Sequence, residues 1–234
     1  MKQKQTVLYC FSPPVMVATF LIESALLAYV LWRYKMSPIV RLISSALVFL
    51  ATFQLAEYYV CGGTGTSAAL WSRVGFVAIT ALPPLGLHLV HLIAERPGRR
   101  LVYIAYATGL AWAVLFGAGD WAFVGHACGG NYVIFDLRGS LMELYCVYYY
   151  GWLLGGIVLA TRFLRKAKKK QGNALMLLVA GYLVFLLPTA TVNILRPESL
   201  MGIPSIMCGF AVVFAFILTF GVLPQVTPKP KEGK

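Results

Sequence analysis

The chain has 234 residues, of which 59% are hydrophobic and only 12% are charged, and its mean hydropathy is +0.76. These values exclude a soluble globular domain and are typical of a polytopic helical membrane protein. A porin-like barrel is disfavoured because the apolar runs are continuous, whereas barrel strands alternate polar and apolar residues. The formal net charge of +12 lies in short joints between the apolar runs, so it indicates membrane orientation and not nucleic-acid binding.

Seven apolar runs predict seven membrane-spanning helices, because ~20 residues rising ~1.5 Å each cross a hydrocarbon layer of ~30 Å. The predicted spans are Pro14 to Trp32, Ile39 to Val60, Leu70 to Ile93, Leu101 to Gly117, Ser140 to Leu164, Ala174 to Leu195 and Pro204 to Leu223. Together they form one membrane domain, residues 1–223, and residues 224–234 are expected to be a short disordered tail. We therefore expect an all-α integral membrane protein, a seven-transmembrane-helix bundle.

Basic residues cluster in the joints after the first, third and fifth spans and behind the seventh. The positive-inside rule then predicts a cytoplasmic C-terminus and, with an odd number of spans, an N-terminus outside. We expect a multi-pass protein of a plasma (inner) membrane. The basic joints Arg96 to Arg100 and Arg162 to Lys170 are expected to meet a partner protein or anionic membrane lipid, although orientation alone accounts for their charge.

The first span carries a single carboxyl group, Glu23, near its middle. No cation is obviously within reach, and removal from water favours the neutral form of a carboxyl group. We therefore expect a protonated, hydrogen-bonded carboxyl in the bundle interior, with a role in proton relay as the alternative.

Polar residues gather near the outer ends of the second and third spans. Gln54 and Glu57 share one face of the second span, and Arg73 lies one turn into the third, across a short joint. Because polar groups in a membrane tend to mark function, we expect these three side chains to line an outward-facing site. The structural alternative is an ion pair between Glu57 and Arg73.

The third span also carries a Pro83-Pro84 pair and, one turn apart near its inner end, His88 and His91. Histidines at this spacing can ligate a metal, but no second ligand helix is evident, so we expect neither a metal nor a cofactor. Intramembrane hydrogen bonding towards the neighbouring inner joint is the expected role of both histidines.

The joint from Ala118 to Gly139 is rich in aromatic residues and is expected to act as an outer lid; for Trp121 an interfacial aromatic belt is the alternative. Cys128 in this joint and Cys61 after the second span both fall on the outer side. Thiols oxidise readily there, so we expect a disulfide between Cys61 and Cys128, with Cys10 as a competitor.

The fifth and sixth spans supply the remaining candidates for the outer site. Glu143 lies at the outer end of the fifth span, close in sequence to an aromatic cluster that includes Tyr149. Tyr182 and Asn193 lie on one stripe of the sixth span, which Pro188 interrupts. With the polar residues of the second and third spans, these side chains are expected to form a cavity with aromatic walls, as a small-molecule site requires.

Missing residues argue against several sharper functions. The seventh span has no lysine for a retinal Schiff base, and its end, ILTFGVLP, lacks the NPxxY-like segment of a G-protein-coupled receptor. No catalytic triad, phosphate loop or HExxH motif occurs, so no enzyme class is supported.

The third span, with Trp71 and Arg73 at its start and LPPLGLHLVHL after it, resembles the N-terminal seven-helix sensor region of bacterial histidine kinases and diguanylate cyclases. The similarity extends to the basic joint RFLRKAKKKQGNALMLLVAGYLVFLLP, to Asn193 before a short outer loop and to the run after Pro204, and it covers most of the chain. It implies an outside-facing input domain whose seventh helix normally continues into a cytoplasmic signalling module. Because this chain ends eleven residues after Leu223 without such a module, signalling in cis is not expected for the sequence as given.

We therefore expect a non-enzymatic membrane sensor or receptor-like protein that signals or assembles through its basic inner joints. Its expected partners are membrane lipid, a small-molecule ligand and a protein acting in trans, and not nucleic acid. A small transporter or proton-coupled carrier is one alternative, in which Glu23, His88 and the proline breaks would move. A structural subunit of a larger membrane complex, packing through Gly151 and Gly155, is the other.

Overall fold

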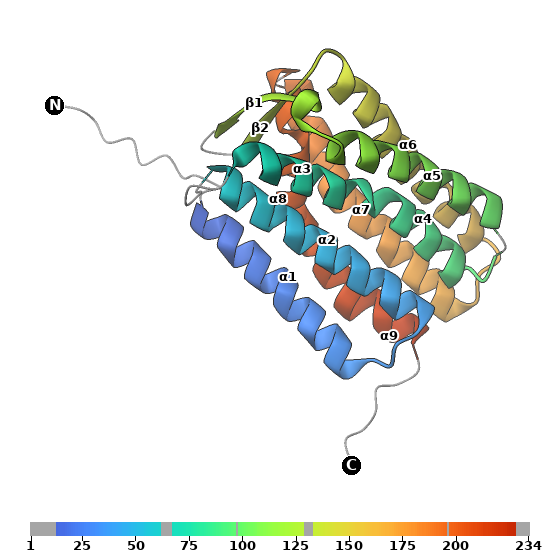
Figure 1. Ribbon diagram of the computed structural model, residues 1–234. Helices are drawn as coiled ribbons and strands as arrows, with labels where there is room; N and C mark the ends of the chain where they lie inside the picture. The colour runs from blue at the N-terminus through green and yellow to red at the C-terminus, as the bar shows by residue number, and fades with distance from the viewer. Residues whose placement is uncertain (1–12, 62–66, 97, 129–132, 196, 228–234) are drawn as a thin grey trace.

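A computed structural model of the chain describes residues 13–61, 67–96, 98–128, 133–195 and 197–227. Seven helical spans in it are long and apolar enough to cross a membrane, and they pack side by side (Figure 1), so the chain is a multi-pass membrane protein. Each end of each span lies within five residues of its predicted position. The spans are Pro14–Arg33, Pro38–Cys61, Ala68–Ile93, Arg99–Gly117, Leu141–Leu164, Lys169–Leu195 and Ser199–Val226.

Five of the spans are single helices, and the third and seventh are composite. The single helices are α1 (Pro13–Arg33), α2 (Pro38–Cys61), α5 (Arg99–Gly117), α6 (Leu141–Leu164) and α7 (Lys169–Leu195). The third span consists of α3 (Ala68–Thr80) and α4 (Leu82–Ile93). The seventh begins with the 3₁₀ turn η2 (Pro197–Gly202), continues as α8 (Ile203–Phe216) and the π-helical segment η3 (Ile217–Val222), and ends in α9 (Leu223–Val226).

The break between α3 and α4 follows from the Pro83-Pro84 pair. Proline has no amide hydrogen, so the carbonyl of Thr80, four residues before Pro84, loses its helical donor. The hydroxyl group of Tyr148 in α6 replaces that donor and lies 2.7 Å from the carbonyl oxygen. The break therefore attaches the third span to α6.

The joint expected to be a lid folds into a β-hairpin, which the sequence analysis did not predict. After the 3₁₀ turn η1 (Asp120–Ala122), β1 (Phe123–Cys128) pairs antiparallel with β2 (Val133–Leu137). Along β2 the first, third and fifth residues are buried, whereas Asp136 is exposed. This alternation shows that one face of the hairpin lies against the helices.

A disulfide bond joins the hairpin to α2. Cys61, the last residue of α2, is bonded to Cys128, the last residue of β1, with their Cα atoms 5.6 Å apart. This is the pair that the sequence analysis selected; its competitor, Cys10, lies outside the described residues.

Aromatic packing and one hydrogen bond hold the same hairpin against α3 and α8. The rings of Phe123 and Phe135 lie 5.3 and 5.2 Å from the ring of Phe76 in α3. The amide of Val133 donates to the hydroxyl oxygen of Ser205, in the first turn of α8, at 3.0 Å. The hairpin therefore covers this end of the bundle, which we call the hairpin end.

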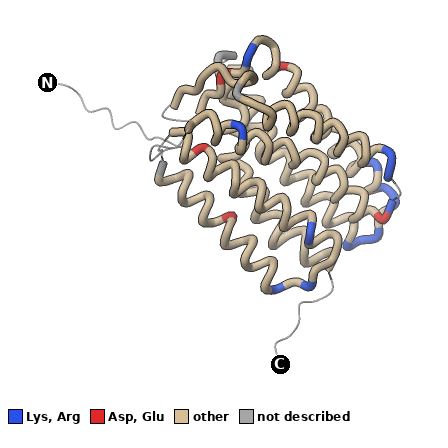
Figure 2. The backbone as a smooth tube through the Cα atoms, in the orientation of Figure 1, with Lys and Arg blue, Asp and Glu red and all other residues tan. Residues whose placement is uncertain are grey.

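Lysine and arginine residues gather at the opposite end of the bundle, which we call the basic end (Figure 2). They come from the joints between α1 and α2, between α4 and α5, and between α6 and α7, and from the adjoining helix turns. Among the described lysine and arginine residues, only Arg73 and Arg138 lie near the hairpin end. The two ends of the bundle thus differ sharply in charge.

Candidate functional site

Buried polar side chains of α1, α2 and α8 meet below the hairpin. Glu23 of α1 and Glu57 of α2 are both fully buried, and their carboxyl groups are close enough to interact electrostatically. Gln54, one turn from Glu57, donates from Nε2 to the backbone carbonyl oxygen of Cys208 in α8 at 3.1 Å. The buried hydroxyl group of Ser205 lies beside Glu57. We call Glu23, Gln54, Glu57 and Ser205 the polar cluster.

The two carboxyl groups of the polar cluster are poorly satisfied. Among the described residues, no oxygen atom of Glu23 or Glu57 has a hydrogen-bond partner of normal geometry, although the hydroxyl group of Ser205 is near Glu57. Burying such groups without partners is costly in an apolar bundle. The polar cluster therefore lowers the stability of the fold.

The expected ion pair between Glu57 and Arg73 is not formed. Arg73 instead donates from Nη2 to the carbonyl oxygen of Gly117 at the end of α5. It also lines a shallow groove with Phe49 and Thr52, on a different face of α2 from Glu57. The two residues are close along the chain, but the rotation of α2 and α3 points them in different directions.

Two small cavities run along the side of α8 that faces the bundle, next to the polar cluster. One, of about 40 Å³, lies between α2, α4, α6, α7 and α8; the other, of about 20 Å³, lies between α3, α6 and α8. Tyr149, Met207 and Cys208 line both cavities, so the two are neighbours. We call them together the α6–α8 cleft.

The walls of the α6–α8 cleft are apolar and aromatic. Tyrosine hydroxyl groups and cysteine thiols, including those of Tyr149, Tyr182 and Cys208, are the polar groups that its lining offers. A buried water needs ~10–15 Å³ of such volume, so the cleft has room for only a few water-sized atoms. Any larger molecule would have to push α6 and α8 apart.

The seventh span forms one wall of the cleft along most of its length. Met207, Cys208, Ala211 and Phe214 of α8 line it at helical spacing, and Leu218 of η3 continues the same row. A π-helical turn within an α-helix is a strained arrangement that frequently occurs at functional sites. The cleft therefore contacts both the regular and the irregular part of one helix.

The seven residues predicted to line an outward-facing site do not come together in one open recess. Gln54 and Glu57 belong to the polar cluster, and Tyr149 and Tyr182 line the cleft. Glu143 is exposed on the surface of α6 and does not face them.

Asn193 has a local structural role in place of the predicted ligand contact. Its Oδ1 atom accepts a hydrogen bond from the hydroxyl group of Ser199 at 2.6 Å, which holds the turn between α7 and η2. The hairpin covers this end of the bundle. The polar and aromatic parts of the expected recess are buried below that cover.

The two histidines of the third span lie near the basic end. Nδ1 of His88 is 3.2 Å from the hydroxyl oxygen of Tyr106 in α5, so its partner is a helix and not the inner joint. His91 is 7% exposed and packs against the ring of Phe163 in α6. Within the part of the chain that the structure describes, no group of three or more potential metal-ligating side chains occurs.

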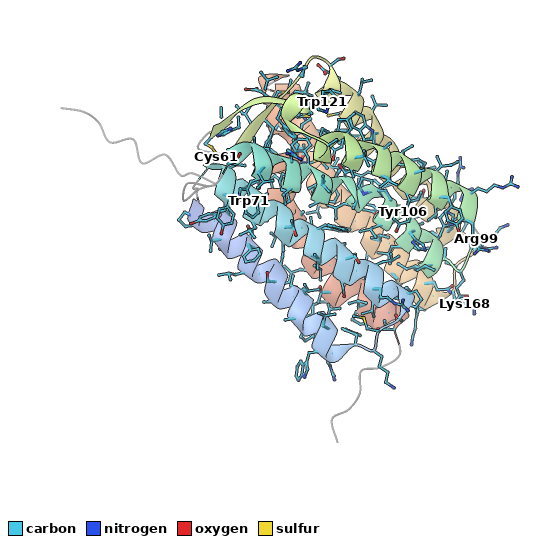
Figure 3. The ribbon with its side chains drawn as sticks, in the orientation of Figure 1. Cys61, Trp71, Arg99, Tyr106, Trp121 and Lys168 are labelled. Atoms are coloured by element: carbon cyan, nitrogen blue, oxygen red, sulfur yellow. A yellow bond between two sulfur atoms is a disulfide. The ribbon has the colours of Figure 1, made fainter. Side chains whose placement is uncertain are left out.

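The aromatic residues of the hairpin end fit an interfacial position. Figure 3 labels Trp71, Trp121 and Cys61 at this end and Tyr106, Arg99 and Lys168 at the other. Trp71 stacks on Tyr59 with ring centroids 4.2 Å apart, and Trp121 is 47% exposed. An interfacial aromatic belt accounts for these side chains.

Sequence reasoning missed Ser205 and the part played by Cys208. A serine directly after Pro204 gave no signal of its own, and the sequence pattern assigned Cys208 no role beyond that of a small apolar residue. Its thiol is indeed buried, but its backbone carbonyl is the acceptor that ties α8 to α2. In comparisons with known proteins, no protein-family model and no curated protein matches this chain.

Proposed function

We propose that the protein is a non-enzymatic membrane sensor whose seventh span responds to what binds at the hairpin end and in the α6–α8 cleft. In this proposal the N-terminus and the hairpin lie outside and the basic end faces the cytoplasm. The concentration of basic residues at one end and the Cys61–Cys128 disulfide near the other support this orientation. The resemblance to seven-helix sensor regions supports the same function.

The observation that carries the proposal is the set of contacts along the seventh span. The hairpin binds it at Ser205, α2 binds it at Cys208, and the cleft follows it as far as Leu218. A helix held at its outer end and flanked by a cavity lower down can change its tilt or register when either contact changes. That change would reach the basic end through η3 and α9.

The chemistry of the cleft indicates the class of molecule that the sensor would bind. Its apolar and aromatic walls fit a small, mainly apolar molecule with at most a hydroxyl or similar group for the tyrosines and Cys208. Because the cavity is small, binding must be coupled to separation of α6 from α8. This coupling is what a sensor requires, since the ligand then favours one arrangement of the seventh span.

Filling the cleft with a larger side chain tests this function without a known ligand. In Ala211→Leu three carbon atoms are added on the side of α8 that lines the cleft, and in the control, Val213→Leu, the side chain on the 47% exposed face of the same helix gains one carbon atom. We expect amide hydrogen exchange of residues 217–227, measured in lipid nanodiscs, to change in Ala211→Leu and not in Val213→Leu. Equal exchange in both variants and the wild type would argue against a responsive seventh span.

A proton-coupled carrier is a second candidate, which the polar cluster specifically favours. Glu23 and Glu57 are buried without a hydrogen-bond partner among the described residues, and the spans around the bundle interior include the break at Pro83-Pro84 and a proline inside α7, Pro188. Interrupted helices beside buried carboxyl groups are common in transporters. Proton flux into pH-dye-loaded proteoliposomes tests it: a carrier predicts flux that Glu23→Gln abolishes, whereas the sensor predicts none.

A further inference from the structure

A third cavity lies at the basic end, between the end of α4 and the start of α5. Its volume is about 340 Å³, much larger than that of the cleft. Its polar lining comes from two histidines, two arginines and two tyrosines, of which Figure 3 labels Arg99 and Tyr106. These residues are His88, His91, Arg96, Arg99, Tyr103 and Tyr106. We call this space the basic cavity.

The charge of the basic cavity is of one sign. Arg96 and Arg99 line it, and none of its lining residues is acidic. The nearest acidic residue in the sequence, Glu95, is exposed and does not line the cavity. An anion is therefore the occupant that these side chains favour.

Helix α5 points its amino end at the same space. Its N-cap residue, Gly98, makes no side-chain capping bond, and the first helical bond of α5 runs from the amide of Val102 to the carbonyl of Gly98. The amides before Val102 consequently have no acceptor within the helix, and such amides attract anions. A side chain at position 98 is not compatible with this geometry, since a Cβ atom there would lie 2.0 Å from Cε1 of His91.

The ring of His91 is a second, independent feature that points to a ligand in the basic cavity. The ring is 7% exposed, lines the basic cavity, and is covered on another side by Phe163. The backbone of Arg96 lies near the ring, but among the described residues neither ring nitrogen has a hydrogen-bond partner of normal geometry. Leaving a buried ring nitrogen unsatisfied is unfavourable. An oxyanion in the cavity would accept the hydrogen bond that the ring can donate.

We infer that the basic cavity binds the phosphate group of an anionic membrane lipid. A phosphate oxyanion fits two guanidinium groups, a histidine and free helix amides at once. Lipid is favoured over free phosphate because Leu92 and Val102 add apolar surface to the lining and Tyr103, at 64% exposure, opens the cavity to the side of α5. The cavity also lies at the helix ends, which is the depth of lipid headgroups.

Lipid binding to the purified full chain in mild detergent tests this inference. Native mass spectrometry would measure the affinity for phosphatidylglycerol, with phosphatidylcholine as the zwitterionic comparison. The double variant Arg96→Gln with Arg99→Gln removes both cationic groups of the cavity. Its matched control, Arg162→Gln with Arg165→Gln, removes the same charge from exposed positions at the same end that do not line the cavity.

We expect phosphatidylglycerol to bind more tightly than phosphatidylcholine, and the cavity variant to lose about ten-fold or more of that affinity because charge-assisted hydrogen bonds are removed. The control variant should keep it. A second variant, His91→Phe, retains a ring to pack on Phe163 but not the nitrogens, and should also lose affinity. Equal losses in cavity and control variants, or no preference for the anionic lipid, would overturn the inference.

Competition with inorganic phosphate distinguishes a lipid phosphate from free phosphate as the occupant of the basic cavity. If the cavity is a lipid site, inorganic phosphate in the millimolar range leaves the bound phosphatidylglycerol in place, because free phosphate lacks contacts with the apolar lining. Displacement of the lipid by inorganic phosphate would instead assign the cavity to free phosphate and overturn the lipid assignment.

Discussion

The side-chain amide of Gln54 donates a hydrogen bond to the backbone carbonyl oxygen of Cys208, 154 residues further along the chain. The bond joins α2 to α8 one turn below Ser205, where the hairpin is attached, and at the level where the two cavities of the α6–α8 cleft meet. Hydrogen bonds between membrane helices fix the rotation of one helix against another. Gln54 therefore determines which face of the seventh span lines the cleft.

Removing this hydrogen bond is expected to loosen α8. In Gln54→Leu the free energy of unfolding should fall by about 0.5–1.5 kcal/mol, and the buried thiol of Cys208 should react faster with N-ethylmaleimide. Thr52→Val, which removes only a hydrogen bond within α2 at an exposed position, is the control. Identical thiol reaction rates in the two variants would show that Gln54 does not hold α8.

Tyr148 is expected to stabilise the break in the third span. Tyr148→Phe removes the hydroxyl group that donates to the carbonyl oxygen of Thr80. The free energy of unfolding should then fall by about 1–3 kcal/mol, because a buried carbonyl loses its donor. The measurement is unfolding in mixed detergent and dodecyl sulfate micelles. Tyr103→Phe removes a hydroxyl group from a 64% exposed ring and should change stability little; a similar loss in both variants contradicts the proposed role.

The disulfide is expected to fix the hairpin to α2. Cys61→Ser should lower stability by about 2–4 kcal/mol and should increase amide hydrogen exchange in β1 and β2. Cys146→Ser, which changes one of the free cysteines, should leave exchange in the hairpin as in the wild type. Unchanged protection of the hairpin amides in Cys61→Ser would contradict this role of the disulfide. It would show that the aromatic contacts with Phe76 are sufficient to hold the hairpin.

The carboxyl groups of the polar cluster are expected to carry their protons. Two buried carboxyl groups that interact electrostatically, with no cation bonded to either among the described residues, would otherwise place two unpaired negative charges in the bundle. Infrared spectra near neutral pH should then show a protonated carboxyl band that weakens in Glu23→Gln and again in Glu57→Gln. Glu143→Gln, at an exposed position, should leave the band unchanged. Absence of the band in the wild type contradicts the expectation.

The membrane spans were predictable because hydrophobic length alone determines them. Their inward faces were not, because spans such as α6 and α7 are apolar on all sides and carry no clear polar face. Glu143 was therefore assigned to the outer site although it lies exposed on the surface of α6, and Glu23 was not matched with Glu57 although the two interact electrostatically.

The hairpin could have been found in the sequence. Four of the five residues from Val133 to Leu137 are large and apolar, with β-branched Val133 and Ile134 among them, and two glycines lie a few residues before, which is a pattern typical of a strand that follows a turn. Its attachment to Ser205 could not have been found in this way, because the contact joins residues 72 positions apart through one backbone amide. The position of the hairpin over the bundle depends on that contact and on the aromatic packing with Phe76.

The central claim is that the seventh span changes its position when the cleft is filled. Spin labels at Met36→Cys, beside the start of α2, and at Gln225→Cys in α9 report this directly through pulsed electron paramagnetic resonance in lipid nanodiscs, in a background that carries Cys10→Ser, Cys146→Ser and Cys208→Ser so that no other thiol takes the label. We predict that adding Ala211→Leu shifts the distance distribution between the labels and that adding Val213→Leu does not. An unchanged distribution in the Ala211→Leu protein, with its hydrogen exchange showing an intact bundle, would contradict the claim.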